Sequence, residues 1–497
     1  MSLLQHPGAI PPGDLRYEAG KSLMFDRTRN EFLKQSNSSA STTSTSNSVA
    51  TVSFWVKRAE IGENNSGFEM NILSGSNSAR AQAIRFTQDD ELEGYFSAIS
   101  AHGITAADWK TNRKFRDTAA WYHIVYRQDT TQSTASNRHR LYVNGVETDN
   151  GTYAALDQNV AFAYFYNAGS YPYAIGNDER DNTYANYYMA DHHYTDGVSN
   201  EPGAFAETND NGVWVPKQYT GSHGSYGHYL KFLNSSGGSG TTAIGGHDYT
   251  TGSASTIGAD SSGNGNHFHV QGYGTKNRTT DSPSNTFATW NILDTRQGAT
   301  FAEGALKVTT GSSQRSYVTA TQGVKNGKWY MEIKSKTAAG SSYVGFCDLS
   351  DLNENTANTL GDNPNEARVN DSGSFEKNNS TTNSWAGSFD NNDIISLLLD
   401  ADNNRFTVAK NGQYADGSGN YDESSPTAYI SFTAGNFMTF ACGDGAGAAS
   451  VIYECNFGNP IFDISSGNAD ANGHGNFEYA PPSGYFALCS KNLAETG

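Results

Sequence analysis

The chain has 497 residues, including 52 Gly, 28 Tyr and 25 Phe, and only 17% of its residues are charged. A formal net charge of −18 excludes nucleic-acid binding through a basic surface and disfavours an anionic membrane as partner, because both need clustered Lys and Arg. A chain of this length has room for two to four domains. No stretch shows a sustained 3.6-residue apolar period, so we expect an almost entirely β protein.

Membrane insertion, secretion and a cysteine framework are all disfavoured. The longest apolar run, residues 394–399, is too short to cross a bilayer. Residues 1–14 lack the basic and apolar regions of a secretory signal, which favours assembly in a reducing cytoplasm. The four cysteines contain no Cys-x-x-Cys pair and are interpreted as small buried side chains: Cys347, Cys442, Cys455 and Cys489.

The first half of the chain carries the clearest strand signals. Residues 1–20 are rich in Pro and Gly and are expected to form an extended N-terminal arm. Residues 49–57 alternate as in a strand, and the aromatic and β-branched residues of 121–126 suit a strand that is packed on both faces. Leu141–Val143 is followed by Asn144-Gly145, which suits a type I′ turn and predicts a hairpin. Short strands between polar turns predict an antiparallel two-sheet sandwich over residues 21–200, in which His123 is a strand residue and not a catalyst.

Three phrases in this region carry a family resemblance. Taken in order, Ser53–Lys57, Ala120–Val125 and Leu141–Gly145 resemble the laminin-G/concanavalin A-like lectin domain. The resemblance covers about residues 20–200 and implies a jelly-roll β-sandwich. It also implies that loop carboxylates within this range are candidates for binding Ca²⁺; no other cofactor is expected.

Residues 201–290 are turn-dense and are interpreted as an irregular Gly/Ser-rich connector with short strands. They contain three distinctive phrases, GVWVPK at 212–217, DSSGNGN at 260–266 and DSPSN at 281–285. Together with the lectin-like domain, this order resembles a family of large virion proteins of tailed bacteriophages, especially marine phages. The family is described as structural or tail-fibre proteins.

A second sandwich is predicted over residues 291–462. The strand phrase GKWYMEI at 327–333 and the hairpin phrase RFTVAKNG at 405–412 resemble the SPRY (B30.2-like) β-sandwich, with a match from about 300 to 460. Residues 463–497 form a C-terminal segment that continues the phage-type pattern. The fold class is therefore all-β, with two antiparallel sandwiches, one concanavalin A-like and one SPRY-like.

Carboxylates offer one candidate for catalysis. Retaining glycosidases place two carboxylates about 5 Å apart, and lectin-like folds host glucanases with a Glu-x-Asp-x-x-Glu signature. Glu91 and Glu93 are the nearest approach, but the central Asp and the third carboxylate are missing. The simpler interpretation is a solvated strand start, so no catalytic residue is predicted.

Two groups of polar residues suggest metal sites but do not predict one. His192 and His193 stand beside Asp191 and Asp196, yet adjacent strand residues point to opposite faces and cannot easily share an ion. The acidic run at 400–404 begins like an EF-hand loop but lacks its Gly and its final Glu, so it is interpreted as an acidic turn.

Tyrosines provide the candidate binding site. Aromatic rings bind the C–H faces of sugars, and Tyr adds a hydroxyl at the rim. The same residues also suit protein–protein interfaces, and half of them should alternate into the core. The candidate glycan-binding residues are Tyr164, Tyr166, Tyr171 and Tyr173.

These features and resemblances lead us to expect a non-enzymatic structural protein of a phage virion, assembled in the host cytoplasm. The expected role is that of a tail fibre or appendage that contacts other virion proteins and the host surface or its glycans. Such components are symmetric, so a homo-oligomer is expected, with a trimer as the working hypothesis. Two alternatives stay open: a capsid-decorating head protein, and a polysaccharide depolymerase on the lectin-like fold.

Overall fold

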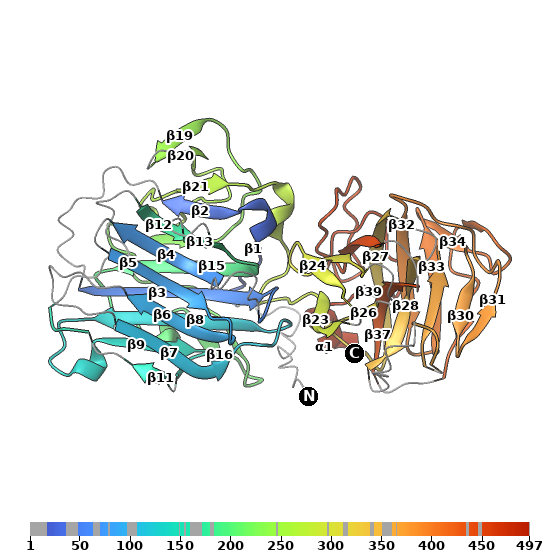
Figure 1. The fold of residues 1–497 in the computed structure, drawn as a ribbon, viewed down its shortest axis with the longest axis horizontal. Helices are drawn as coiled ribbons and strands as arrows, with labels where there is room; N and C mark the ends of the chain where they lie inside the picture. Colours follow the sequence, from blue (N-terminus) through green and yellow to red (C-terminus); the bar gives the residue numbers. More distant parts are fainter. Residues whose placement is uncertain are drawn as a thin grey trace. The chain divides into compact units, whose positions relative to one another are not determined.

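The computed structural model describes most of the chain, and every structural statement below refers to the described residues. These are residues 17–35, 48–62, 70–77, 80–96, 107–148, 150–153, 156–159, 171–178, 183–244, 247–295, 298–311, 317–337, 342–349, 360–363, 365–433, 437–445 and 450–496. The chain divides into two compact units, Met1–Ser284 and Asn285–Gly497 (Figure 1). Both units consist almost entirely of antiparallel β-sheet, which confirms the predicted fold class.

The first unit contains two large sheets. Sheet A has the order β10 (Val146–Glu147), β9 (His139–Val143), β8 (Trp121–Asp129), β3 (Val49–Arg58), β15 (Tyr187–Asp196), β1 (Ser22–Phe25) and β22 (Arg278–Thr279), and β18 (His228–Leu230) also pairs with β15. Sheet B has the order β11 (Asn150–Tyr153), β7 (Ala107–Lys114), β6 (Glu91–Phe96), β5 (Arg80–Phe86), β4 (Met70–Asn77), β12 (Tyr171–Ile175), β2 (Phe32–Gln35), β21 (Phe268–Gln271), β20 (His247–Thr250) and β19 (Thr241–Ile244).

Alternation along the strands explains why the two sheets pack together. Val52, Phe54 and Val56 on β3 share one apolar core with Ile84 and Trp109 of sheet B. The intervening residues of β3 point to the opposite, outer face of sheet A, because successive strand side chains alternate. Burying two such faces supplies the main favourable free energy of a sandwich.

The Asn144-Gly145 signal forms a tight turn, as predicted. Val143 pairs with Val146, so the turn joins β9 to β10. Both central residues have positive φ, 50° at Asn144 and 79° at Gly145, which is the backbone of a type I′ turn. Strands β8 and β9, which precede this turn, pair with each other and are joined by the longer connection at residues 130–138.

One irregularity decides which way the histidines of β15 point. The register between β15 and β3 shifts between Ala190 and His193, and Asp191 has a φ of 51°. A residue added in this way forms a β-bulge and re-aims the side chains that follow it. His192 consequently lies in the core beside Tyr173, whereas His193 lies on the outer face beside Phe205.

Residues 201–284, predicted as a connector, instead complete the first unit. Strands β18, β21 and β22 add to both sheets, and β16 (Ala206–Thr208) pairs with β17 (Trp214–Pro216) as a separate hairpin. Phe205 and Tyr219 pack on Val125 and Tyr142, which lie on the outer face of sheet A. We call residues 201–231 the cover segment. This region has short strands and polar side-chain contacts in place of long strands with alternating residues. Its composition therefore suggested a linker.

The second unit is also built from two sheets. Sheet C has the order β23 (Trp290–Thr295), β26 (Tyr317–Ala320), β37 (Met438–Asp444), β28 (Ser342–Asp348), β29 (Ala367–Asn370), β30 (Phe375–Lys377) and β31 (Ser380–Thr382). Sheet D has the order β24 (Thr300–Ala302), β25 (Lys307–Thr309), β38 (Ile452–Asn456), β27 (Lys328–Thr337), β32 (Ile394–Asp400), β33 (Arg405–Lys410), β34 (Gln413–Ala415) and β35 (Tyr421–Glu423), with β36 (Ile430–Ser431) on β33 and β39 (Phe486–Ala487) on β27.

The C-terminal segment is fastened to the second unit by a buried carboxylate. Glu332 on β27 accepts hydrogen bonds from the backbone N–H groups of Tyr479 at 2.7 Å and Glu478 at 3.0 Å. It also accepts from the Tyr330 hydroxyl at 3.1 Å and from Nδ2 of Asn456 at 3.0 Å. Helix α1 (Ser490–Thr496) closes this segment. Phe477, Tyr485 and Cys489 of this segment also pack with Tyr330 and Leu398 of sheet D in one apolar cluster.

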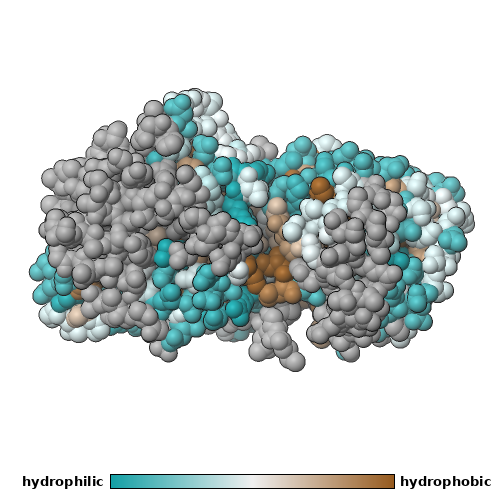
Figure 2. Space-filling view, viewed as in Figure 1, coloured by the Kyte–Doolittle hydropathy of each residue, from teal (hydrophilic) through white to brown (hydrophobic). Residues whose placement is uncertain are grey.

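The four cysteines lie where the sequence predicts them. Cys347, Cys442, Cys455 and Cys489 are all free and buried, as predicted. Among the described residues, no helix is long and apolar enough to cross a membrane. On the face shown in Figure 2, the described surface is mainly hydrophilic or intermediate in hydropathy.

Candidate functional site

The four candidate glycan-binding tyrosines do not all reach the surface. Tyr164 and Tyr166 lie outside the described residues, as does the side chain of Tyr171 at the start of β12. Tyr173 is only 3% exposed, and its hydroxyl hydrogen-bonds Nε2 of His192 at 3.0 Å. This corrects the expectation for Tyr173, because the alternation of β12 turns its ring between the sheets, where a sugar cannot reach it.

The carboxylates suggested for a hydrolase meet shared cations. On β6, Glu93 lies 3.2 Å and Glu91 lies 4.0 Å from Nζ of Lys110. Arg85 on β5 contributes a guanidinium 2.7 Å from Glu93. A retaining glycosidase needs one carboxyl group that carries a proton and another that is free to attack. Cross-strand ion pairs hold both groups here, which favours a structural role.

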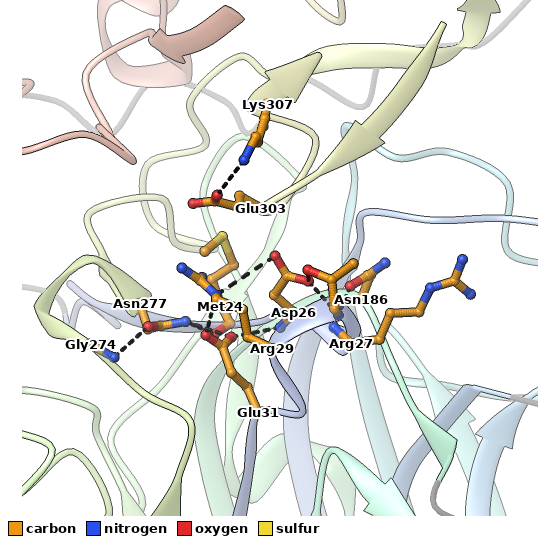
Figure 3. Close-up of polar contacts among 11 residues, drawn as sticks. Met24, Asp26, Arg27, Arg29, Glu31, Asn186, Gly274, Asn277, Glu303 and Lys307 are labelled. Carbon is orange, nitrogen blue, oxygen red and sulfur yellow. Dashed lines mark hydrogen bonds and ion pairs between the residues drawn. The ribbon is translucent and has the colours of Figure 1, made fainter. Parts of the chain in front are cut away.

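A second carboxylate pair, Asp26 and Glu31, lies at the turn between β1 and β2 (Figure 3). Glu31 accepts hydrogen bonds of 2.7 Å from the backbone N–H of Asp26 and from Nδ2 of Asn277, and Nε of Arg29 lies 2.7 Å from its other oxygen. Burial raises the pKa of Glu31 to about 7, and the Arg29 and Asn277 contacts oppose this shift. Glu31 can hold a proton near neutral pH. Both carboxylates are fully buried, however, and their hydrogen bonds hold the turn between β1 and β2 in place.

His123 is the first member of a cluster on the outer face of sheet A. Its ring stacks on Trp55 at a centroid distance of 4.7 Å. Nδ1 accepts a hydrogen bond of 3.0 Å from Nε1 of Trp214, and Nε2 lies 2.8 Å from the Ser53 hydroxyl. Since indole can only donate, the proton of the neutral imidazole sits on Nε2. Burial lowers the pKa of His123 to about 3, so this histidine is a neutral link between sheet and cover segment.

The same face carries an Asp–His–His chain. Oδ2 of Asp191 lies 3.7 Å from Nε2 of His193, and Nδ1 of His193 lies 3.1 Å from Nε2 of His223 in the cover segment. Asp191 also accepts hydrogen bonds from the hydroxyls of Tyr229 at 2.5 Å and Tyr17 at 2.6 Å. Burial alone would raise the pKa of Asp191, but these partners hold it below its ordinary value. The chain runs from a buried carboxylate to a partly exposed imidazole.

The distinctive phrases at residues 212–217 and 281–285 contain side chains that contact sheet A. Trp214 of the 212–217 phrase lies over the Asn144-Gly145 turn, so closely that a Cβ at Gly145 would be 2.8 Å from the indole ring. Asp281 of the 281–285 phrase forms a buried ion pair of 2.7 Å with Lys57 on β3. Each phrase therefore serves to fasten the outer layer.

The 260–266 phrase forms a loop that holds the chain before β18. Asp260 accepts hydrogen bonds from the backbone N–H groups of Tyr229 at 2.9 Å and Asn266 at 2.9 Å. Side-chain amides of Asn264 and Asn266 donate to the carbonyl of Gly227 at 2.9 and 2.8 Å. Because N–H donors surround the Asp260 carboxylate, this loop is a backbone clamp and does not present oxygens for a cation.

The metal candidates resolve into structural contacts. His192 and His193 lie on opposite faces of β15, which confirms the prediction about the directions of their side chains. In the 400–404 turn, Asp400 accepts from Nε of Arg405 at 2.8 Å and lies 3.8 Å from Nζ of Lys328. Within the part of the chain that the structure describes, no group of three or more His, Cys, Asp or Glu side chains is arranged to hold a metal ion.

The comparison with known families bears on the first unit. Residues 34–198 match the concanavalin A-like lectin/glucanases superfamily. The match covers less than half of the chain, so it describes the concanavalin A-like domain and not the whole protein. It agrees with the resemblance predicted for residues 20–200. No curated protein matches the chain in sequence.

Solved structures provide further likenesses in fold. The SPRY domain of human HERC1 is 15% identical, with 33% of this chain and 96% of that chain covered at a TM-score of 0.26. The PSpry domain of TRIM65 is 11% identical, with coverages of 34% and 91% and a TM-score of 0.25. A Bacteroides ovatus protein described as carbohydrate binding is 14% identical, with coverages of 51% and 57% and a TM-score of 0.30. These likenesses carry no argument about function.

Several residues of the outer-face cluster were not identified from the sequence. Trp214, His223 and Tyr229 lie in the stretch interpreted as a connector, where no strand pattern placed them against β15. The one available signal was the concentration of Trp, Tyr and His over residues 214–229, which is unusual for a flexible linker.

Proposed function

We propose that this chain is a non-enzymatic virion structural protein whose concanavalin A-like domain binds a glycan at the host surface. The observation that carries the proposal is a lectin-type fold in which the candidate catalytic carboxylates are committed to ion pairs, as for Glu93 between Arg85 and Lys110. The motif order of the whole chain, which resembles phage tail-fibre proteins, supports the virion assignment. The proposed partners are other virion proteins and identical copies of the chain in a homotrimer.

The glycan-binding residues that we propose are Tyr164, Tyr166 and Tyr171, because tyrosine rings stack on sugars and their hydroxyls can form hydrogen bonds at the rim. Tyr173 is not among them, because it packs in the core.

Glycan binding is tested with the full chain on an array of bacterial surface polysaccharides. We expect binding to at least one polysaccharide, reduced about tenfold or more in the Tyr164→Ala/Tyr166→Ala variant, since each stacked ring contributes about 1 kcal/mol. Tyr173→Phe is the matched control and should bind like the parent chain. Equal binding by all three proteins would exclude these residues as the binding site.

Location in the particle separates the structural alternatives. A labelled antibody viewed by electron microscopy should mark the tail or its appendages. Labelling over the whole head would favour a capsid-decorating protein instead.

The hydrolytic alternative concerns Glu91 and Glu93 on β6, the nearest approach in this chain to a glucanase signature. Shortening of a host polysaccharide by the purified chain, abolished by Glu91→Gln/Glu93→Gln, would overturn the non-enzymatic proposal.

A further inference from the structure

Five of the twelve histidines of the chain lie where strands β8 and β15 of sheet A meet the cover segment, which includes β18. We call this place the seam. Four are at most 1% exposed, and His223 is partly exposed; the set is His123, His192, His193, His223 and His228. Imidazole is the side chain whose charge changes between about pH 5 and pH 8. The attachment of the cover segment therefore involves several imidazoles, a side chain that takes up a proton below about pH 6.5 once it is exposed to water.

On the outer face, the contact between His193 and His223 requires that at most one of them is charged. Their nitrogens are 3.1 Å apart, and one must donate while the other accepts. His193 also stacks on Tyr229 of β18 at 3.9 Å. Burial and the neighbouring His193 lower the pKa of His223 to about 4.

On the inner face, His192 and His228 stack in parallel, with ring centroids 5.1 Å apart. Their surroundings are Tyr173 of β12, Phe268 of β21 and Tyr194 of β15. Neither ring nitrogen of His228 has a hydrogen-bond partner among the described residues. Burial holds the pKa of both histidines well below the ordinary value, because a charge there would be desolvated.

The charges that face this seam cannot compensate for full protonation. Asp191 of β15 is the carboxylate beside His193, and Asp260 acts on His223 from the 260–266 loop. The other facing titratable side chains are the hydroxyls of Tyr17, Tyr173, Tyr194, Tyr219 and Tyr229. The ammonium of Lys231 lies 4.9 Å from the centre of the Tyr229 ring and adds a positive charge. The Asp191 carboxylate can offset one positive charge at this seam, but further protons would bring like charges together in a desolvated place.

We propose that this seam is an acid-sensitive latch, in which the cover segment, including β18, separates from β15 and the rest of sheet A while the remaining sandwich stays folded. The weak point is β18, a strand of three residues, whereas β15, the strand with which it pairs, has ten. Release transfers His223 and His228 to water and exposes His193, so several protons are taken up at the cost of one short strand. The uncovered surface includes Trp55, Val125 and Tyr142. The latch is independent of glycan binding.

Hydrogen exchange measured by mass spectrometry on the full chain tests the latch. At about pH 7.5, peptides from 203–231 and from β3 and β8 should all be protected. At about pH 5, after correction for intrinsic rates, the 203–231 peptides should lose protection at least about tenfold while β3 and β8 keep it. Loss of protection by all peptides at one pH, or retained protection of 203–231 at about pH 5, would overturn the proposal.

Variants identify the histidines responsible. His223→Gln keeps a hydrogen-bonding side chain and His228→Phe keeps a ring, and neither replacement titrates. In the double variant, the pH at which 203–231 opens should fall by about one unit. His474→Gln, in the second unit, is the matched control and should leave the opening pH unchanged. An unchanged opening pH in the double variant would overturn the assignment to this seam, and a variant that is unprotected at neutral pH leaves the decision to the two-pH comparison of the parent chain.

Discussion

Removal of the ion pair between Lys57 and Asp281 tests whether residues 201–284 are an integral part of the first unit. Nζ of Lys57 lies 2.7 Å from Oδ2 of Asp281, and their side chains are 1% and 0% exposed. Nε1 of Trp121 donates to the same carboxylate at 3.3 Å. Asp281→Asn leaves a buried ammonium without its counter-ion, and loss of one partner of such a pair costs about 3–5 kcal/mol.

Urea denaturation of the full chain, read by hydrogen exchange in peptides from β3 and β8, measures this cost. With a slope of about 2 kcal/mol per molar urea, the midpoint of the first unit should fall by about 2 M. Lys57→Met should be as harmful, because it leaves the buried Asp281 carboxylate without the positive charge of Lys57. The double variant Lys57→Met/Asp281→Leu should recover most of the loss, since neither charge then remains. A change within about 0.5 kcal/mol in Asp281→Asn would refute the reasoning and return residues 201–284 to the role of a connector.

Three further predictions concern individual contacts. Glu332→Gln places an amide against donors that now meet a carboxylate, and should lower the unfolding free energy of the second unit by about 2–4 kcal/mol in urea denaturation. Because burial raises the pKa of Glu332 from 4.5 to about 7, the stability of the second unit should fall as pH rises through that range, and Glu332→Gln should remove this slope. Gly145→Ala strains a φ of 79° and meets Trp214, so thermal unfolding of the first unit should occur several degrees lower. The pKa of His123, lowered from 6.5 to about 3, implies a loss of about 5 kcal/mol as pH falls through that interval, and acid denaturation of His123→Gln should be correspondingly shallower.

Short-range patterns predicted much of the fold, because they depend on local backbone preferences. Alternation over 49–57 and 121–126 identified β3 and β8, and Asn144-Gly145 identified a turn with two positive φ values. Adjacent histidines on a strand were correctly placed on opposite faces. The same rule was not enough for Tyr173, since alternation says that a face changes but not which face is the core.

Long-range pairing is what the local patterns did not reveal. Asp281 meets Lys57 from 224 residues away, and Trp214 meets His123 from 91 residues away. The short strands at 228–230 and 268–271 carry little periodicity, so composition suggested a linker where the structure has an added layer. Buried carboxylates such as Glu332 likewise look like ordinary charged residues until their donors are known.

The sequence by itself determined the fold class, the main strands and turns of both sandwiches and the burial of the four cysteines. These features follow from side-chain chemistry over a few residues. Only the tertiary structure decided that residues 201–231 cover sheet A and that five histidines share one seam. The physical reason is that burial and proton affinity depend on neighbours brought from distant parts of the chain. The sequence does not distinguish an exposed histidine from one that is buried under a stacked ring. Burial nevertheless disfavours the charged form and lowers the pKa of the buried histidine.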